Sequence, residues 1–477
     1  MKKIKVRFAP APTGFLHLGG ARTALFNFLF AKKHEGEFIL RIEDTDKERS
    51  KKEFEEDIIE GLKWLGISWD KIFHQSERIE IYKKYLKKLF DEGKVYPCFC
   101  SKEELEAQRQ EKLSRGQVPI YSGKCRKLTK KDWEKFFREG RSFVLRFKTP
   151  IKKIKFKDII RGKVEFDTKL IGDFAISQGF ERPLFLIAGV IDDFEMGISH
   201  VIRGEDHLSN TPKQILLQEA LGFPRPEYAH IPLILGKDRS KLSKRHGAVR
   251  IRDYKEMGIL PEAMVNYLAL LGWSSKDNRE FFSMEELIEK FSLKDVHKGG
   301  AVFSQRKLEW INQLWMRKLE IEDLAKRAIP FLKKAGLIKD EYDFEKIKSI
   351  VRVERERMRK LSDLPELADF FFKEKDYDPK LLFWRGMTKE KLLLSLKKSL
   401  DLIKKIPEES FVAMHLKDVF LKEAEKFSED RGELLWPLRV ALSFKKASPP
   451  FFEIMEILGK KETEKRVEFA IKKIENL

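Results

Sequence analysis

The pattern of apolar and polar positions predicts that the chain opens with strands and helices in alternation. Short alternating runs predict strands over 3–8 and 38–42. Apolar residues three and four apart predict helices over 21–31, 54–65 and 79–90. Strands that alternate with helices form parallel sheets, and ligands bind such sheets in a crevice at the carboxyl ends of the strands. We therefore expect an α/β domain at the start of the chain.

A different pattern interrupts this domain. Strands are predicted over 142–148 and 163–167, inside a segment (98–190) whose content favours an α+β module inserted between two halves of the sheet. The sheet is expected to resume over 191–256. Its predicted elements are a strand ending at 201–203, a helix over 211–221 and a strand over 231–235.

The last part of the chain is predicted to be helical. Residues 257–320 have a mixed, mostly helical pattern, and 321–477 are helical almost throughout. Helices over 346–360, 389–405 and 460–474 carry apolar residues three and four apart with basic residues between them. Most of these lysines fit solvated helix faces. The formal net charge of +20 nevertheless suits a polyanionic partner.

Length and composition narrow the class of protein. With 477 residues, 42% of them hydrophobic, the chain is long enough for several domains with their own cores. Three cysteines cannot form an even disulfide framework. We expect no signal peptide, because the first predicted strand follows Met1 closely, and no apolar run approaches the ~18 residues of a membrane span. These features predict a cytoplasmic protein.

The first candidate site lies between the first strand and the first helix. Pro10 and Pro12 force a loop there, and His17, Gly19 and Gly20 follow where the helix should begin. A helix N-terminus offers free N–H groups to a phosphate, and glycines let the phosphate approach the backbone. By itself this turn is weak evidence, and a helix start with a solvated histidine fits it better.

The second candidate site is the basic run KLSKR at 241–245, between Gly236 and Gly247. Alone it fits a solvated loop in a lysine-rich protein. The two stretches together, in this order, indicate a split nucleotide site. Cations on such a loop can stabilise the negative charge that develops on phosphates during a reaction.

These two stretches resemble the HIGH and KMSKS signatures of class I aminoacyl-tRNA synthetases. Further segments resemble glutamyl-tRNA synthetase of the bacterial type. They are GGARTALFNFLFA (19–31), RIEDTD (41–46), VIRGEDHLSNTPKQ (201–214), KLSKRHGA (241–248), LPEAMVNYLALLGW (260–273) and KLEWIN (307–312). The resemblance is dense over roughly the first two thirds of the chain and continues, more loosely, to its end.

The resemblance implies an α/β catalytic domain of the Rossmann-like class I type, with three further parts and a monomeric state. The expected boundaries are 1–97 with 191–256 for the catalytic domain, 98–190 for an insertion that binds the tRNA acceptor end, 257–320 for a stem-contact domain and 321–477 for an α-helical anticodon-binding domain.

The implied reaction joins L-glutamate to ATP, with Mg²⁺, to give glutamyl-adenylate and pyrophosphate. The glutamyl group then passes to the 3′-terminal ribose of tRNA(Glu), releasing AMP. The residues implied for ATP are Thr13, His17, Gly19, Gly20, Asp206, Lys241, Leu242, Ser243, Lys244 and Arg245. Those implied in catalysis are His17, Gly19, Gly20, Lys241 and Lys244. No protein nucleophile is needed, since the substrates supply the attacking oxygens.

A glutamate site must satisfy two carboxylates and one ammonium. Arg7 and Arg203 suit the carboxylates, because guanidinium forms bidentate pairs with them, and Glu43 suits the ammonium. All three match the amino-acid pocket of the family and fall at the ends of predicted strands that face one crevice. Which arginine binds which carboxylate stays open.

Three positions of this pocket depart from the family. Ala11 stands where serine is usual, and Phe185 and Leu186 stand where tyrosine and asparagine are usual. A pocket that loses hydrogen-bonding groups can lose discrimination as well as affinity. The departures therefore bear on amino-acid selectivity.

The three cysteines form a candidate zinc site. Cys98, Cys100 and Cys125 could supply three of the four ligands that structural zinc takes. Some glutamyl-tRNA synthetases show Cys-x-Cys…Cys-x-His, but Lys127 occupies the last position here and is a poor ligand. Tyr121 could be the fourth ligand, as a related glutamyl-transferring enzyme suggests. Three structural thiols without metal are the alternative.

Three other functions compete with a discriminating ligase. A non-discriminating enzyme would also, or instead, charge tRNA(Gln) with glutamate, and the anticodon domain, with 351–361 as a reading helix, would decide this. A catalytically silent tRNA-binding paralogue would be expected to have a broken ATP signature, yet His17, Lys241 and Lys244 are all present. A small-substrate adenylyltransferase, such as a pantoate ligase relative, would not need the C-terminal helices.

Overall fold

The computed structural model describes residues 3–243, 247 and 249–477. The chain forms two compact units. The first comprises Met1–Lys255 and Pro261–Leu308, and the second comprises Glu256–Leu260 and Glu309–Leu477. Among the described residues, none of the helices has the length and apolar character to cross a membrane.

The first unit is built on parallel strands, as the alternating pattern predicts. One sheet has the order β1-β2-β3, with β1 at Lys5–Phe8, β2 at Glu37–Ile42 and β3 at Lys71–His74. The other has the order β10-β11-β6-β7, with β6 at Lys153–Asp158, β7 at Gly162–Asp167, β10 at His200–Gly204 and β11 at Glu227–Ile231. Strands β10 and β11 are parallel, whereas β6 and β7 form an antiparallel hairpin. The N–H of Ser199 donates to the carbonyl of Lys5 at 2.9 Å, so β10 begins beside β1.

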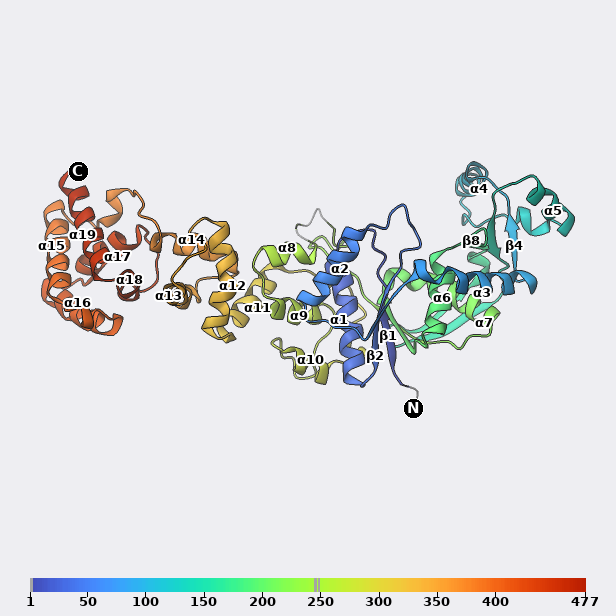
Figure 1. Ribbon diagram of the computed structural model, residues 1–477, viewed down its shortest axis with the longest axis horizontal. Coiled ribbons are helices and arrows are strands. Elements are labelled where there is room, and N and C mark those ends of the chain that lie inside the picture. Colours follow the sequence, from blue (N-terminus) through green and yellow to red (C-terminus); the bar gives the residue numbers. More distant parts are fainter. Residues whose placement is uncertain (1–2, 244–246, 248) are drawn as a thin grey trace. The chain divides into compact units, whose positions relative to one another are not determined.

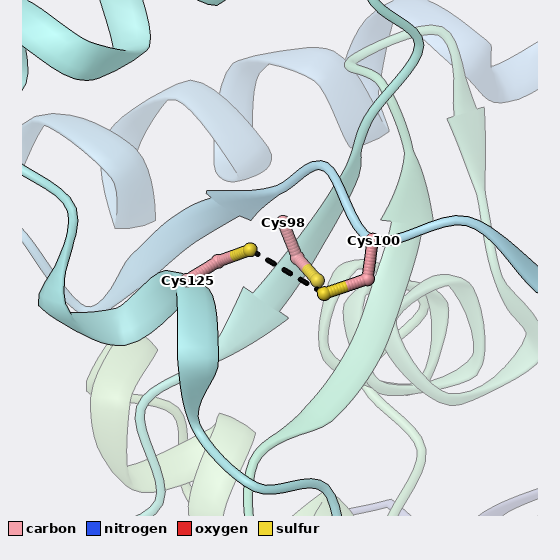
Figure 2. Close-up of side chains that lie close together, drawn as sticks. All are labelled: Cys98, Cys100 and Cys125. Atoms are coloured by element: carbon pink, nitrogen blue, oxygen red, sulfur yellow. Dashed lines mark hydrogen bonds between the residues drawn. The ribbon is translucent and has the colours of Figure 1, made fainter. Parts of the chain in front are cut away.

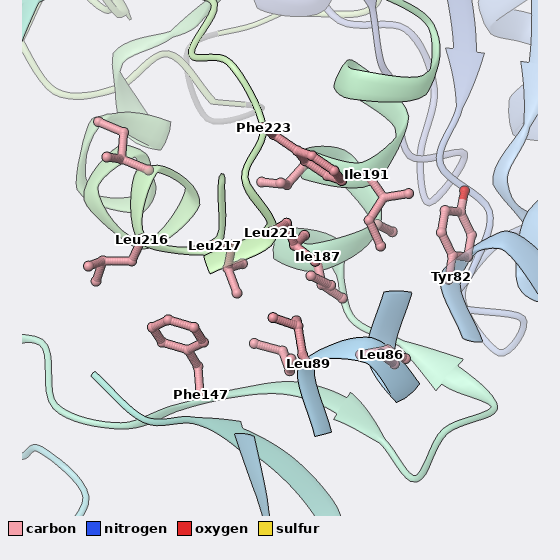
Figure 3. Packing of buried hydrophobic residues seen from close by; sticks show 14 of the residues in the cluster. Tyr82, Leu86, Leu89, Phe147, Ile187, Ile191, Leu216, Leu217, Leu221 and Phe223 are labelled. Carbon is pink, nitrogen blue, oxygen red and sulfur yellow. The ribbon is translucent and has the colours of Figure 1, made fainter. Parts of the chain in front are cut away.

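Helices accompany these strands, and three of them share one core. The helices are α1 (Leu18–Lys33), α2 (Lys52–Trp64), α3 (Ile79–Asp91), α6 (Phe185–Glu195) and α7 (Thr211–Leu221). Figure 3 shows apolar side chains of α3, α6 and α7 meeting over Phe147. Tyr82, Leu86, Ile187 and Leu217 are fully buried there. The core therefore fixes α6, which carries Asp193, the partner of two arginines of the cleft described below.

An antiparallel sheet of order β4-β5-β8-β9 adjoins this core. Its strands are β4 (Val95–Cys98), β5 (Val144–Phe147), β8 (Phe174–Gln178) and β9 (Arg182–Pro183), and it is accompanied by α4 (Lys102–Ser114) and α5 (Lys130–Arg138). Helix α4 begins with a capping box made by Ser101 and Glu104, and α5 with one made by Thr129 and Asp132. This combination of sheet and helices agrees with the predicted α+β content.

The strand predicted over 231–235 is split, which corrects that prediction. Strand β11 ends at Ile231, and Pro232 follows without an N–H to donate. A two-residue strand, β12 (Ile234–Leu235), then pairs in parallel with β13 (Ala301–Val302). The remaining helices of this unit are α8 (Ile251–Glu256), α9 (Pro261–Leu270) and α10 (Met284–Lys290).

The second unit is helical in all its described elements, drawn from yellow to red in Figure 1. Its α-helices are α11 (Gln305–Lys318, whose first turn belongs to the first unit), α12 (Ile321–Lys334), α13 (Phe344–Glu354), α14 (Leu364–Ala368), α15 (Lys389–Lys405), α16 (Ala413–Phe427), α17 (Gly432–Ser443), α18 (Phe451–Leu458) and α19 (Lys460–Glu475). The helix predicted over 346–360 is wrong at its C-terminal end. Tertiary partners take the backbone groups beyond α13: the N–H of Leu361 donates to Gly258, and the carbonyl of Arg359 accepts from Asn312.

Candidate active site

A cleft of ≈ 800 Å³ opens at the carboxyl ends of β1, β2 and β10. It gathers every described residue that the sequence assigns to ATP or to glutamate. These are Arg7, Ala11, Thr13, His17, Gly19, Gly20, Glu43, Phe185, Arg203, Asp206, Lys241, Leu242 and Ser243. Lys244 and Arg245 lie outside the described residues.

Backbone hydrogen bonds join the first nucleotide motif to the segment that follows the second. The N–H of Leu18 donates to Val249 at 3.0 Å, and the N–H of Ile251 donates to Leu16 at 2.9 Å. His17 forms an antiparallel bridge with Arg250 between these bonds. Two stretches far apart in the sequence therefore line one wall of the cleft.

His17 caps helix α1 and faces the cleft. Its Nδ1 accepts a hydrogen bond from the N–H of Gly20 at 3.1 Å. Desolvation lowers the pKa of His17, and the charge of Lys241 lowers it further, so the ring is neutral at pH 7. Since Nδ1 is an acceptor, the ring proton is on Nε2, where it can donate to a phosphate oxygen. A Cβ at Gly19 would lie 3.2 Å from the His17 ring, which explains the need for glycine at this position.

Lys241 projects from the other side of the cleft. Its ammonium lies 3.1 Å from a carboxylate oxygen of Asp206, which follows strand β10. The backbone of Lys241 bridges to Leu235 at the end of β12. A cation is therefore held at the cleft by a strand end and a carboxylate.

A buried network of charges forms the floor of the cleft. Asp193 on α6 accepts from Arg7 Nε at 2.9 Å and from Arg41 Nη1 at 2.7 Å. Arg41 Nη2 in turn donates to Glu43 Oε1 at 3.1 Å. All four side chains are almost completely buried. Arg7 and Glu43, which the sequence assigns to glutamate, thus belong to one ion network.

Sequence reasoning missed Arg41 and Asp193 as parts of this site. Two signals could have found them. Arg41 is the one charge within the predicted strand 38–42 and stands two residues before Glu43, so both can point to the same face. Asp193 lies in an apolar helix, where an acidic residue needs a partner.

The electrostatics of the network follow from burial and proximity. Burial raises the pKa of Glu43 although Arg41 and Arg7 oppose it. Burial also raises the pKa of Asp193, but Arg7 and Arg41 outweigh this and the net shift is downward. Burial, together with the nearby charge of Arg7, lowers the pKa of Arg203 to about 10. The charged groups of the cleft floor can therefore bind a ligand that carries two carboxylates and one ammonium at neutral pH.

Arg203 approaches the same floor from strand β10. Its Nη2 donates to Thr211 Oγ1 at 2.9 Å, and its Nε donates to His230 Nε2 at 3.2 Å. Within the described part of the chain, no acidic side chain forms an ion pair with Arg203, whereas Arg7 pairs with Asp193. Arg203 is thus held by neutral partners beside the cleft.

Comparison with known proteins agrees with this geometry. Residues 3–310 match the catalytic domain of the class I tRNA synthetases (E and Q), and residues 323–471 match an anticodon binding domain. Glutamate–tRNA ligase 1 of Caldanaerobacter subterraneus subsp. tengcongensis is 47% identical, over 100% of this chain and 99% of the relative. The chain belongs to the class I glutamate–tRNA ligase family.

Other members of the family resemble the chain over its whole length. Glutamate–tRNA ligase of Aquifex aeolicus is 48% identical, over 99% of this chain and 100% of the relative. A crystal structure of a glutamate–tRNA ligase from Elizabethkingia meningosepticum, in complex with its amino acid, is 35% identical. It has a TM-score of 0.90 and covers 99% of this chain and 100% of its own. The predicted fold class is thereby confirmed, with its parallel-sheet catalytic domain and helical C-terminal domain.

Two of the three departures from the glutamate–tRNA ligase family reach the cleft. Ala11 and Phe185 line it, and the Phe185 ring lies 5.4 Å from the ring of His207. Leu186 instead packs against the hydrophobic core. Only two polar groups are therefore missing from the cleft itself.

The three thiols of this family member converge, as Figure 2 shows. The sulfur atoms of Cys98, Cys100 and Cys125 lie within 4.8 Å of one another. The Tyr121 hydroxyl lies 3.4 Å from Cys98 Sγ and 3.5 Å from Cys100 Sγ. A hydrogen bond from Cys125 lowers the pKa of Cys98 towards the thiolate form, which is the form that binds metals. Three sulfurs and a phenolic oxygen thus surround one point.

Proposed function

We propose that this chain is a glutamate–tRNA ligase. It activates L-glutamate with ATP to glutamyl-adenylate and transfers the glutamyl group to the 3′-terminal ribose of tRNA(Glu), releasing pyrophosphate and AMP. The observation that carries this proposal is the cleft, which brings the two nucleotide motifs and the Arg7, Glu43 and Arg203 cluster together.

The proposed roles at the floor of the cleft follow from charge. The guanidinium groups of Arg7 and Arg203 receive the two carboxylates of glutamate. Glu43 receives the ammonium with Oε2, since Oε1 already accepts from Arg41. Glutamate carries one more negative than positive charge, and the excess of arginine at the floor matches this.

The proposed roles above the floor concern ATP. His17 and the backbone of Gly19 and Gly20 hold the α-phosphate, and Lys241 with Lys244 neutralises the leaving pyrophosphate. Thr13, Asp206, Leu242, Ser243 and Arg245 complete the nucleotide site. Mg²⁺ comes with ATP and is held mainly by phosphates and water. Catalysis rests on positioning and on charge, because the attacking oxygens belong to glutamate and to tRNA.

We propose that three further parts of the chain bind the tRNA. The protein is proposed to act as a monomer in the cytoplasm. Residues 98–190 bind the acceptor end, 257–320 the stem and 321–477 the anticodon. The net charge of +20 supports phosphate contacts, and we expect tRNA affinity to fall with salt.

We further propose that Cys98, Cys100, Cys125 and Tyr121 hold one structural zinc ion. Their donor atoms fit its preference for four ligands rich in sulfur. Zinc there would tie the end of β4 to the loop after α4. Atomic absorption on the purified protein is expected to give one zinc per chain, and a metal-free protein of full activity would disprove the site.

The proposed function is tested by charging purified transcripts of tRNA(Glu) and tRNA(Gln) with labelled glutamate. Charging of tRNA(Glu) alone is the expected result. Charging of both, or of tRNA(Gln) alone, would mean a non-discriminating enzyme whose product an amidotransferase must convert. Charging of neither would overturn the proposal and favour a silent tRNA-binding paralogue.

A further inference from the structure

We propose that His230, held by Asp158, is a positioning residue that aims Arg203 at the amino-acid substrate. This inference rests on the proposed function, because it gives Arg203 the role of binding a glutamate carboxylate. Neither His230 nor Asp158 lines the cleft, so both act through Arg203.

His230 and Asp158 form a completely buried pair. His230 Nδ1 lies 2.6 Å from Asp158 Oδ2, and neither side chain has any exposed surface. The N–H of His230 also donates to the same oxygen at 3.1 Å. Asp158 Oδ1 accepts from the N–H groups of Ile160 and Arg161 at 2.9 and 2.8 Å. Both carboxylate oxygens thus accept hydrogen bonds, and Asp158 is fixed as an anion.

These contacts determine which nitrogen of the His230 ring carries the proton. An anionic Asp158 requires a donor at Nδ1, so the proton is on Nδ1 and Nε2 has a free lone pair. Burial lowers the pKa of His230, which keeps the ring neutral. Nε2 then accepts from Arg203 Nε at 3.2 Å and lies 3.1 Å from Thr211 Oγ1.

The free lone pair gives Arg203 a neutral anchor. His230 Nε2 holds the Nε end of the guanidinium, and Thr211 Oγ1 holds Nη2. Two bonds on one planar group fix its orientation, and neither partner cancels its positive charge. A carboxylate partner, which Arg7 has in Asp193, would fix the group but offset part of its charge. The arrangement therefore keeps Arg203 both rigid and available to a substrate carboxylate.

The anchor comes from outside the strands that line the cleft. Asp158 is the last residue of β6, beside the turn of the β6–β7 hairpin, and it pairs with Tyr228 of β11. The affinity for glutamate is thus made to depend on a hairpin that contributes no residue to the cleft. If the His230–Asp158 pair were purely structural, it would stabilise the hairpin without affecting KM for glutamate.

The test compares His230→Asn with His230→Gln in steady-state charging of tRNA(Glu) by the full-length enzyme. Asparagine keeps a donor for Asp158 but offers nothing at the position of Nε2. Glutamine can extend its amide oxygen towards Arg203. The matched control is His74→Asn, because His74 Nε2 lies 2.8 Å from Glu55 in a second histidine–carboxylate pair whose members do not line the cleft.

We expect His230→Asn to raise KM for glutamate by at least about tenfold while KM for ATP changes by less than about twofold. His230→Gln should recover part of this loss, and His74→Asn should leave both constants unchanged. A parallel rise of both KM values, or an unchanged KM for glutamate in a folded His230→Asn protein, would overturn the inference. A wild-type enzyme that charges no glutamate would overturn the proposed function and this inference with it, whereas the variant results overturn the inference alone.

Discussion

The Glu43→Gln variant tests whether the negative charge of Glu43 binds the substrate ammonium. The substitution removes this charge and keeps the shape of the side chain. In the wild-type protein, Glu43 Oε1 accepts from Arg41 Nε at 3.3 Å and from Nη2 at 3.1 Å. The amide oxygen of glutamine can accept the same two bonds. Arg41 also keeps Asp193 at 2.7 Å. The substitution therefore removes one negative charge beside the substrate and leaves the local packing in place.

The expected loss follows from the value of a charged hydrogen bond. Such a bond contributes about 1.5–3 kcal/mol, so KM for glutamate should rise about 10- to 150-fold. KM for ATP should not change, because the nucleotide contacts lie at the other motifs. The assay is charging of tRNA(Glu) at saturating ATP with varied glutamate, alongside thermal unfolding to confirm that the variant folds.

The pH dependence adds a second, independent test. Burial raises the pKa of Glu43, so the carboxylate takes up a proton as the pH falls, earlier than an exposed glutamate would. The ammonium then loses its counter-charge, and kcat/KM for glutamate should fall on the acid side of neutrality. Glu43→Gln has no such group to titrate, and its kcat/KM should lack this part of the fall.

A matched control lies on the same strand. Glu37 is also buried in β2, but it pairs with Lys5 and Lys71 and does not line the cleft. Glu37→Gln should leave KM for glutamate unchanged. The reasoning is refuted if Glu43→Gln binds glutamate as the wild type does, or if both variants lose the same affinity.

Three further predictions concern the other parts of the molecule. Lys241→Ala should lower kcat about 10²- to 10³-fold, whereas Lys237→Ala in the same loop should not, as rapid-quench measurement of adenylate formation would show. A chelator should lower the melting temperature of the wild type but not that of Cys98→Ala, and equal shifts would exclude zinc. Burial raises the pKa of Glu354 to about 7, so its deprotonation costs stability as the pH rises between about 4.5 and 7. Glu354→Gln should therefore be more stable than the wild type by up to about 3 kcal/mol at pH 8 and by almost nothing at pH 4.5 in chemical unfolding, and a constant difference would contradict this.

The pattern of apolar and polar residues predicted the helices whose ends depend on nearby residues in the sequence. The helix predicted over 389–405 has the same bounds as α15, and that over 211–221 the same bounds as α7. The predicted end of a helix was wrong where residues distant in the sequence bond to its backbone. Residues after Glu354 leave the helix because Gly258 and Asn312 take their backbone groups, and no pattern within 346–360 contains that information.

The candidate site divides in the same way. His17, Gly19 and Lys241 stand in short motifs with a clear chemical reason, so the sequence alone could propose them. The anchor of Arg203 could not be assigned, since Asp158 and His230 belong to no recognisable motif and stand in strands that carry other polar residues as well. Their meaning appears only when the β6–β7 hairpin joins β11 and brings the two side chains to 2.6 Å.

Amino-acid choice is the most direct test of the central claim, which is that the charged floor of the cleft selects glutamate. The measurement is charging of tRNA(Glu) by the wild-type enzyme with each of the common amino acids in turn. The Arg7, Glu43 and Arg203 cluster predicts that glutamate alone is attached, despite Ala11 and Phe185. Attachment of a different amino acid, or equal attachment of glutamine, would contradict the account.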